Sequence, residues 1–320
     1  MSGDWRPTAS MVTLTRRAEL LARTRAFFAA RGVLEVETPI LSRGGPTDPQ
    51  IEPLVTTVRG LQGDYYLGTS PEYAMKRLLA AGSGDIYQIA RVFRDGECGR
   101  WHNPEFTLIE WYRVGFDDAA LMHEVEELVA QLLVPHTLAA AERLTYAEAL
   151  QRHAGIDVHR DDDRALQQAA IRHGIDCDAA LDRDARLDLL MGLVVGPKLG
   201  RGRPTFICDY PASQAALARL KPGEPPVAAR FECYLDGIEL ANGFHELADA
   251  REQAARFAQD LASRRVRGQS TPRIDEHLLA ALRHGLPDCA GVALGFDRLA
   301  ALAVGAQSLA EAMAFPIGTA

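Results

Sequence analysis

Two arginines in one polar loop give the first chemical signal in the chain. The stretch 91–112 reads RVFRDGECGRWHNPEFTLIEWY, with Arg94 ending a run of β-forming residues and Arg100 in the loop that follows. Guanidinium groups match phosphate oxygens with paired N–H donors and keep their charge. The pattern therefore predicts two strands joined by a cationic loop that can hold a polyphosphate. An ordinary surface hairpin with solvated arginines is the alternative that the residues leave open.

A pair of carboxylates gives the second signal. In 231–244 (FECYLDGIELANGF), Asp236-Gly237 is a two-residue hairpin turn between β-rich runs. A regular register places Glu232 opposite Ala241 and sets Glu232 and Glu239 on one face, about 7 Å apart. Two such carboxylates repel by roughly 2–3 kcal/mol, and a Mg²⁺ ion shared with a phosphate would relieve this repulsion. A carboxylate that reaches solvent or pairs with arginine is the open alternative.

Two predicted helix starts carry further candidates. Residues 291–305 (GVALGFDRLAALAVG) read as a strand that meets a helix at Gly295, with Arg298 in the first turn, which suits an anion. Residues 70–82 read as a second helix, with Ser70 as N-cap, Pro71 at the first position and Glu72 in the first turn. From the residues alone, Glu72 is better explained as a charge that complements the helix dipole.

Several other elements are needed to position these side chains. We expect a helix over 15–31, an extended strand over 31–41, and a helical insertion over about 135–200 that carries little chemistry. Strand 204–211, a helix over 211–220 and a polar helix over 249–266 follow. Alternation along the second strand of the first hairpin predicts one face with Phe106, Leu108, Glu110 and Tyr112, and another with Thr107, Ile109, Trp111 and Arg113.

Composition narrows the class of protein. The chain of 320 residues has 47% hydrophobic and 24% charged residues and a net charge of −8. This is ordinary for a globular protein, and the acidic balance argues against extensive contact with nucleic-acid phosphates. The five scattered cysteines indicate free thiols in a reducing cytoplasm. No run reaches membrane-span length, and MSGDWRPTAS has no apolar core of a signal peptide.

The three signals together resemble the lysyl branch of the class II aminoacyl-tRNA synthetases. F-R-D-x-E, R-x-H-N-P-E-F-T and E-x-Y match motif 2, the helix and strand ending at Pro39 match motif 1, and G-V-A-L-G-F-D-R matches motif 3. The similarity runs from about residue 15 to 315. It implies an α+β fold, with an antiparallel sheet flanked by helices, as one catalytic domain over 1–320 that forms a homodimer.

The resemblance also assigns roles to individual residues. It implies ATP contacts for motif 2, the second hairpin and motif 3, with Arg94 and Arg298 catalytic; the nucleotide-binding set is Arg94, Asp95, Gly96, Asn103, Phe106, Glu239, Leu240, Gly295 and Arg298. It implies that Mg²⁺ is held by Glu232 and Glu239. It implies amino-acid contacts for Ser70, Pro71, Glu72, Tyr112, Asn242, Glu246 and Ala293. The motif 2 acid is displaced, because Glu97 follows a glycine at the position where many synthetases have the acid.

Two departures narrow the branch. The chain leaves no room for the N-terminal anticodon-binding domain of lysyl-tRNA synthetases, and Ala293 stands where motif 3 has its middle glycine. With these two departures, the sequence resembles the synthetase paralogues that activate (R)-β-lysine with ATP and attach it to a lysine of elongation factor P. A truncated lysyl-tRNA synthetase or free amino-acid ligase, and a non-catalytic regulator that binds lysine or AMP, are the alternatives. Retention of the charged residues argues against the regulator.

Overall fold

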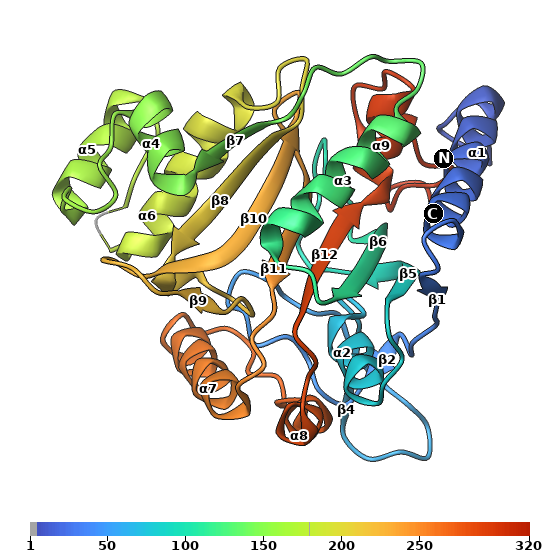
Figure 1. Cartoon of the computed structure of the whole chain (residues 1–320), viewed down its shortest axis with the longest axis horizontal. Coiled ribbons are helices and arrows are strands. Elements are labelled where there is room, and N and C mark those ends of the chain that lie inside the picture. Colours follow the sequence, from blue (N-terminus) through green and yellow to red (C-terminus); the bar gives the residue numbers. More distant parts are fainter. Residues whose placement is uncertain (1–4, 179) are drawn as a thin grey trace. The chain divides into compact units, whose positions relative to one another are not determined.

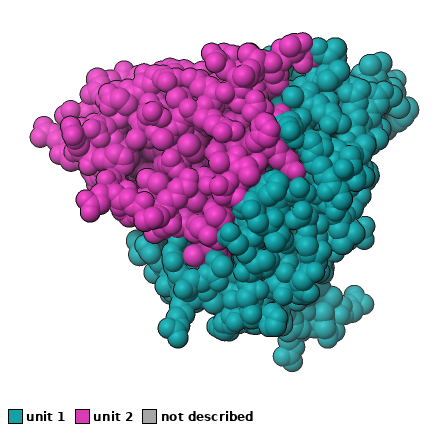
Figure 2. Space-filling model, viewed as in Figure 1, with its two compact units in different colours: residues 1–116, 127–135, 248–320 teal, residues 117–126, 136–247 magenta. Residues whose placement is uncertain are grey.

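The computed structural model describes residues 5–178 and 180–320, which form two compact units (Figure 2). Unit 1 contains residues 1–116, 127–135 and 248–320, and unit 2 contains 117–126 and 136–247. The first four residues of the predicted leaderless N-terminus lie outside the described part. Within that part, no helix is both long and apolar enough to cross a bilayer. The single-domain organisation stays a prediction.

Unit 1 is built on the strand order β1-β5-β6-β12. It also contains a separate small sheet with the order β2-β4-β3. The strands are β1 (Leu34–Glu35), β2 (Leu41–Ser42), β3 (Val55–Thr57), β4 (Asp64–Leu67), β5 (Ile86–Phe93), β6 (Glu105–Val114) and β12 (Cys289–Gly295). The β5–β6 and β6–β12 pairs are antiparallel, and β1–β5 is parallel. The predicted hairpin around the arginine loop is therefore confirmed.

Helices complete unit 1 (Figure 1). They are α1 (Met11–Ala29), α2 (Glu72–Ala80), α7 (Ala250–Val266), α8 (Glu276–His284) and α9 (Phe296–Ala303), while α3 (Asp118–Leu132) runs through both units. The C-terminal segment returns to the start of α1, where Thr8 donates its N–H to the carbonyl of Ala314 at 2.9 Å. The predicted strand-to-helix junction at Gly295 is confirmed, with Gly295 as N-cap of α9.

The core of unit 1 lies on one face of β5 and β6. Trp111 is fully buried, and the ring of Phe28 from α1 lies 5.3 Å from its ring. The same Phe28 stacks on Tyr87, the residue opposite Trp111 across the ladder, at 4.3 Å. The predicted alternation along β6 therefore places its apolar side against α1. The other side, with Glu110 and Tyr112, is left to carry chemistry.

Unit 2 is built on the strand order β11-β10-β8-β7, with β9 paired to β10. These strands are β7 (Glu142–Thr145), β8 (Thr205–Pro211), β9 (Leu220–Lys221), β10 (Val227–Leu235) and β11 (Ile238–His245). Helices α4 (Tyr146–Ala154), α5 (Asp163–Arg172) and α6 (Arg183–Leu190) gather on one side of them (Figure 1). A buried apolar cluster joins these helices to β8 and β10.

Three predicted elements are corrected. The extended strand over 31–41 is broken, because the chain leaves β5 before Pro39 and re-enters another sheet as β2. Helix α2 begins at Glu72 with Pro71 as N-cap, although the hydroxyl of Ser70 still accepts the N–H of Glu72 at 3.0 Å. Residues 211–220 form only a short 3-10 turn, because Ala216 adopts φ +47 and the chain is drawn into β9.

Candidate active site

The predicted site residues fall in both units, and each group is built from its own elements. In unit 1 they come from the start of α2, from β5, β6 and the loop between them, and from β12 and α9. In unit 2 they all come from the β10–β11 hairpin and its end. The group in unit 1 is described first.

A buried carboxylate organises the non-core face of β6. Glu110 is 2% exposed, and its two oxygens accept the hydroxyls of Ser70 and Tyr112 at 2.7 and 2.8 Å. Two predicted residues, far apart in sequence, are thus joined by a third that the sequence analysis did not single out. An ionised carboxylate has about four lone-pair sites, so it can accept from a cation in addition to these hydroxyls. Glu110 is therefore suited to an ammonium group.

Strand β12 leaves this face open. Gly291, Ala293 and Gly295 alternate along it and lie opposite Tyr112, Glu110 and Leu108 of β6. Residues with no side chain or a single methyl leave the sheet surface beside Glu110 bare, so that a flat or extended substrate can lie against it. Ala293 sits directly across from the buried carboxylate. Its methyl group therefore lies on the strand position that borders Glu110, and its role toward the amino acid stays a prediction.

Glu72 is held by a buried lysine. Nζ of Lys76, one turn later on α2, lies 2.7 Å from Oε1 of Glu72, and Lys76 is 1% exposed. The side chain of Glu72 remains 16% exposed. Burial of an ammonium is costly unless it is paired, so Lys76 fixes the Glu72 carboxylate at the start of the helix. A second ammonium, from a substrate, would share this carboxylate.

Arg94 lies at the end of β5 over an aromatic ring. Its guanidinium carbon is 5.1 Å from the ring centre of Phe106, and its Nη1 is 3.4 Å from Oε1 of Glu97. Gly96 adopts φ +75, so the glycine-permitted turn is present and brings Glu97 back to Arg94. The carboxylate of Asp95 accepts a hydrogen bond from the N–H of Gly96 at 2.8 Å. Arginine and phenylalanine thus form a platform suited to a stacked ring and a phosphate.

Arg298 projects from α9 to the far end of the same loop. Its Nε donates to the carbonyl of Trp101 at 3.1 Å, and its Nη2 lies 2.8 Å from Nε2 of His102. The next residue, Asn103, is 6% exposed; its amide nitrogen donates to the carbonyl of Glu105, and its oxygen accepts the N–H of Ile317. The side chain of Asn103 therefore braces the loop, and its nucleotide contact stays a prediction.

The loop also carries an exposed thiol. Cys98 follows Glu97 and is exposed, whereas the other described cysteines are buried or half-buried. All five are free, as the sequence predicted.

In unit 2, burial and the neighbouring carboxylate of Asp209 raise the pKa of the Cys208 thiol to about 12.

The hairpin of unit 2 corrects a predicted register. Its turn is as expected, with Asp236 at φ +50 and Gly237 at φ +77, but Glu232 lies opposite Asn242 instead of Ala241. The ladder passes over Leu240, which is 2% exposed, as a β-bulge. Without the bulge, alternation would place Glu239 and Asn242 on opposite faces. With it, both share the face of Glu232.

The carboxylate of Glu232 is held on this face. Its Oε1 accepts from Nη2 of Arg230 and its Oε2 from the hydroxyl of Tyr234, each at 2.7 Å. Tyr234 lies opposite Glu239. Burial, followed by the charges of Glu232 and Glu239, raises the pKa of the Tyr234 hydroxyl well above 10.0. The predicted pair of carboxylates thus lies on one face. Leu240 is buried beneath them.

The remaining predicted residue, Glu246, follows the end of β11. It is 1% exposed and forms an isolated antiparallel bridge with Ala218, while its carbonyl accepts from Nε of Arg219 at 3.1 Å. Residues Asn242, Phe244 and Glu246 alternate onto the face of Glu232 and Glu239 beyond the bulge. The described residues contain no cluster of three or more histidine, cysteine or acidic side chains typical of a resident metal site. Two carboxylates alone suit Mg²⁺ that is shared with phosphates.

Comparison with known proteins fits this arrangement. A family model for class II tRNA synthetases (D, K and N) matches residues 3–319. The chain belongs to this family. The α+β class predicted from the sequence is thereby confirmed, and the sheets contain parallel pairs, β1–β5 and β7–β8, as well as antiparallel ones.

Curated relatives of this synthetase-family chain are similar over their full length. A protein of Yersinia enterocolitica is 49% identical over 325 residues, covering 100% of this chain and 99% of the relative. Proteins of Salmonella arizonae and Salmonella dublin are 50% and 51% identical over 322 residues, covering 99% of this chain and 98% of each relative. All three are named elongation factor P–(R)-β-lysine ligase.

Proposed function

We propose that this chain activates (R)-β-lysine with ATP and transfers it to a lysine ε-amine of elongation factor P. The observation that carries the proposal is the match to ligases of that name over 98–99% of their length. The buried carboxylate of Glu110 beside the bare face of β12 supports a substrate with an ammonium group. The reaction belongs in the cytoplasm, and the enzyme acts as a homodimer without stable tRNA binding.

The first step joins the amino acid to AMP. A carboxylate oxygen of β-lysine attacks the α-phosphorus of ATP, and the bond to the leaving pyrophosphate breaks. Arg94 holds the α-phosphate and the substrate carboxylate, and Phe106 and Arg298 enclose the adenine. Asp95, Gly96, Asn103, Leu240 and Gly295 contact the nucleotide. Catalysis by this set is positioning and charge stabilisation, which suits arginines set on rigid strands and helices.

Divalent cation chemistry is assigned to the β10–β11 hairpin. Glu232 and Glu239 would hold Mg²⁺, which neutralises negative charge on the β- and γ-phosphates, and Arg298 contributes a fixed positive charge there. The shared face of the two carboxylates supports this assignment. Arg230, which pairs with Glu232 at 2.7 Å, keeps that carboxylate oriented.

The amino acid is held at two ends. Glu72, fixed by Lys76, takes the ammonium near the substrate carboxylate, with Ser70 and Pro71 shaping the wall. Tyr112, Glu246 and the newly found Glu110 take the side-chain ammonium, and Asn242 lines the pocket. Ala293 fills space near the α-carbon. In the second step the acceptor amine attacks the anhydride carbonyl, loses a proton and releases AMP.

Two measurements test the proposal. ATP–pyrophosphate exchange would be compared for (R)-β-lysine and L-α-lysine, and transfer would be followed as the mass increase of purified elongation factor P. We expect exchange with β-lysine, and transfer that disappears when the acceptor lysine is replaced by arginine. Exchange confined to α-lysine would instead identify a tRNA-type or free amino-acid ligase, which the family match also allows. Absence of exchange with both would favour a non-catalytic binder.

A further inference from the structure

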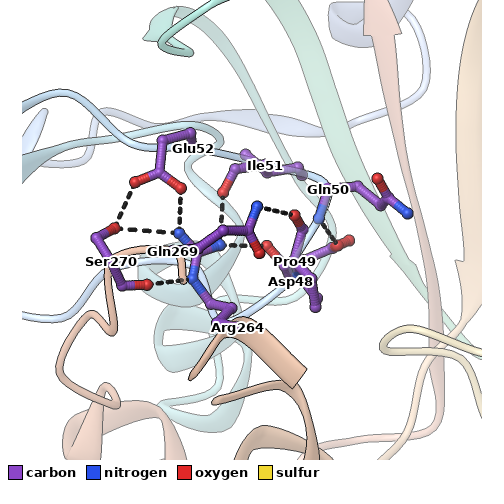
Figure 3. Close-up of polar contacts among 8 residues, drawn as sticks. All are labelled: Asp48, Pro49, Gln50, Ile51, Glu52, Arg264, Gln269 and Ser270. Atoms are coloured by element: carbon purple, nitrogen blue, oxygen red, sulfur yellow. Dashed lines mark hydrogen bonds and ion pairs between the residues drawn. The ribbon is translucent and has the colours of Figure 1, made fainter. Parts of the chain in front are cut away.

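A fully buried arginine outside the proposed site occupies the end of α7. Arg264 is 0% exposed, and its guanidinium points into the segment 48–52 (Figure 3). Its Nε donates to the carbonyl of Ser270 at 2.5 Å, and its Nη1 donates to the carbonyls of Asp48 and Ile51 at 2.7 and 3.1 Å. Its Nη2 donates to the carboxylate of Glu52 and to the hydroxyl of Ser270.

These contacts use all of the donors that a guanidinium has. Arginine carries five N–H donors in a fixed planar fork, and each of the five finds an acceptor here. Ser270 closes the ring by donating its hydroxyl to the other oxygen of Glu52, and Gln269 donates to the carbonyl of Pro49 at 2.9 Å (Figure 3). A lysine has three donors without the fork, so it cannot replace this arginine.

The clamped segment is bonded directly to the arginine loop after β5. The backbone N–H of Asp95 donates to the carbonyl of Glu52 at 2.8 Å. Asp95 follows Arg94, whose guanidinium makes two long polar contacts among the described residues, 3.4 Å to the carbonyl of Thr69 and 3.4 Å to Glu97. The direction of Arg94 therefore depends on where its backbone is held, and Glu52 holds the next residue.

We propose that Arg264 is a positioning residue for the nucleotide site. By clamping Glu52 it fixes the carbonyl that receives the N–H of Asp95, and so it sets Arg94 for the phosphates of ATP. This inference rests on the proposed function, in which Arg94 binds ATP. A side chain on α7 that does not touch the substrate then controls the affinity for nucleotide. Misplacement of a substrate-holding group by about 1 Å can cost roughly 100-fold in rate.

The test compares two substitutions in the clamp with two controls. Arg264→Lys keeps the charge and loses the fork, and Glu52→Gln keeps the size of the side chain and loses its charge, while the backbone carbonyl of Glu52 remains. Arg265→Lys makes the same change at the exposed neighbour on α7. Leu20→Ala lowers the stability of unit 1 from the buried face of α1. Pyrophosphate exchange gives KM for ATP and for the amino acid, and hydrogen exchange gives the protection of the Asp95 amide.

We expect Arg264→Lys and Glu52→Gln to raise KM for ATP by roughly 10-fold or more, with KM for the amino acid within about 2-fold. We also expect them to expose the Asp95 amide to exchange, with neither effect in Arg265→Lys or Leu20→Ala. Unchanged KM for ATP and unchanged Asp95 protection in both clamp variants would overturn the inference. If the wild-type chain catalysed no exchange, the proposed function would fail, and Asp95 protection alone would decide whether Arg264 positions the loop.

Discussion

Nη2 of Arg298 lies 2.8 Å from Nε2 of His102, so helix α9 and the loop after β5 are joined by an arginine and a histidine. Burial first, and then the positive charge of Arg298, lower the pKa of His102 below 6.5. The neutral ring can accept a hydrogen bond from Arg298 through Nε2, whereas the protonated ring cannot. This contact therefore depends on pH.

Lowering the pH should weaken this junction. The folded protein disfavours protonated His102. The contribution of His102 to the stability of the fold is therefore fully present above about pH 6.5, and it is lost as the pH drops from that value toward the lower folded-state pKa. We expect the imidazole of His102 to titrate below 6.5 in an NMR titration, because burial and the charge of Arg298 lower its pKa. Because Arg298 belongs to the proposed ATP site, we expect KM for ATP to rise at low pH in the wild-type protein. His102→Gln should remove this rise, because glutamine does not titrate. A His102 midpoint at or above 6.5 would contradict the expectation.

Glu110→Gln should weaken binding of the amino acid. The substitution removes a buried negative charge that accepts the hydroxyls of Ser70 and Tyr112, and a charged hydrogen bond contributes about 1.5–3 kcal/mol. We expect KM for (R)-β-lysine in pyrophosphate exchange to rise roughly 10- to 100-fold, with KM for ATP nearly unchanged. Tyr112→Phe, which removes one donor and leaves the charge, is the milder companion variant. Equal changes in both KM values would point to a folding defect.

Ala293→Gly should move selectivity toward ordinary α-lysine. Ala293 lies opposite Glu110 in the β6–β12 ladder. In the proposed function, its methyl group closes space near the α-carbon of the substrate. Removing it returns the middle glycine of motif 3 and about one methyl of volume. The ratio of kcat/KM for (R)-β-lysine to that for L-α-lysine should fall by roughly 10-fold or more. If this ratio stayed constant, Ala293 would not explain the choice of amino acid.

Glu239→Gln should raise the Mg²⁺ requirement. Glu232 and Glu239 share a face of the hairpin. Losing one of the two charges would weaken the binding of a cation that is held between the protein and the phosphates. We expect the Mg²⁺ concentration for half-maximal exchange to increase by roughly 10-fold. Asp236→Asn, in the exposed turn of the same hairpin, is the control. An unchanged Mg²⁺ dependence would remove this hairpin from the metal site.

Asp260→Asn should stabilise the protein at neutral pH. Burial is the main cause that raises the pKa of Asp260 from 3.8 to about 6, against the hydrogen bond donated by Thr47 at 2.7 Å. A raised folded-state pKa favours folding at low pH, and this contribution is lost as the pH rises from about 4 to about 6. The variant should gain about 1 kcal/mol over wild type at pH 8, after allowance for solvent screening, and little at about pH 4. Urea unfolding, with exposed Asp64→Asn as control, measures the difference.

Local patterns predicted much of the framework. Period-two alternation along β6 correctly separated the face with Trp111, packed on α1, from the face with Glu110 and Tyr112. The Asp236-Gly237 turn was equally readable, because it is determined within a few residues of the chain. Such elements are determined by neighbours in the chain.

What the sequence did not reveal depends on contacts between distant residues. Glu110 was placed on the correct face but not recognised, because its significance comes from Ser70, 40 residues earlier. The bulge at Leu240 leaves no mark in the turn that sets the hairpin register. Arg264 reads as one more cation of a polar helix, and its acceptors at Asp48 and Glu52 lie more than 200 residues away. Tertiary packing decides all three.

Cys98 offers a way to watch the arginine loop directly. It is exposed four residues after Arg94, and the other described cysteines are buried or half-buried, so a maleimide dye should attach there first in the native protein. The label would sit beside Glu97 without an engineered cysteine. Its fluorescence would then follow the loop in real time as ATP arrives and pyrophosphate leaves, which separates nucleotide capture from the chemistry that follows.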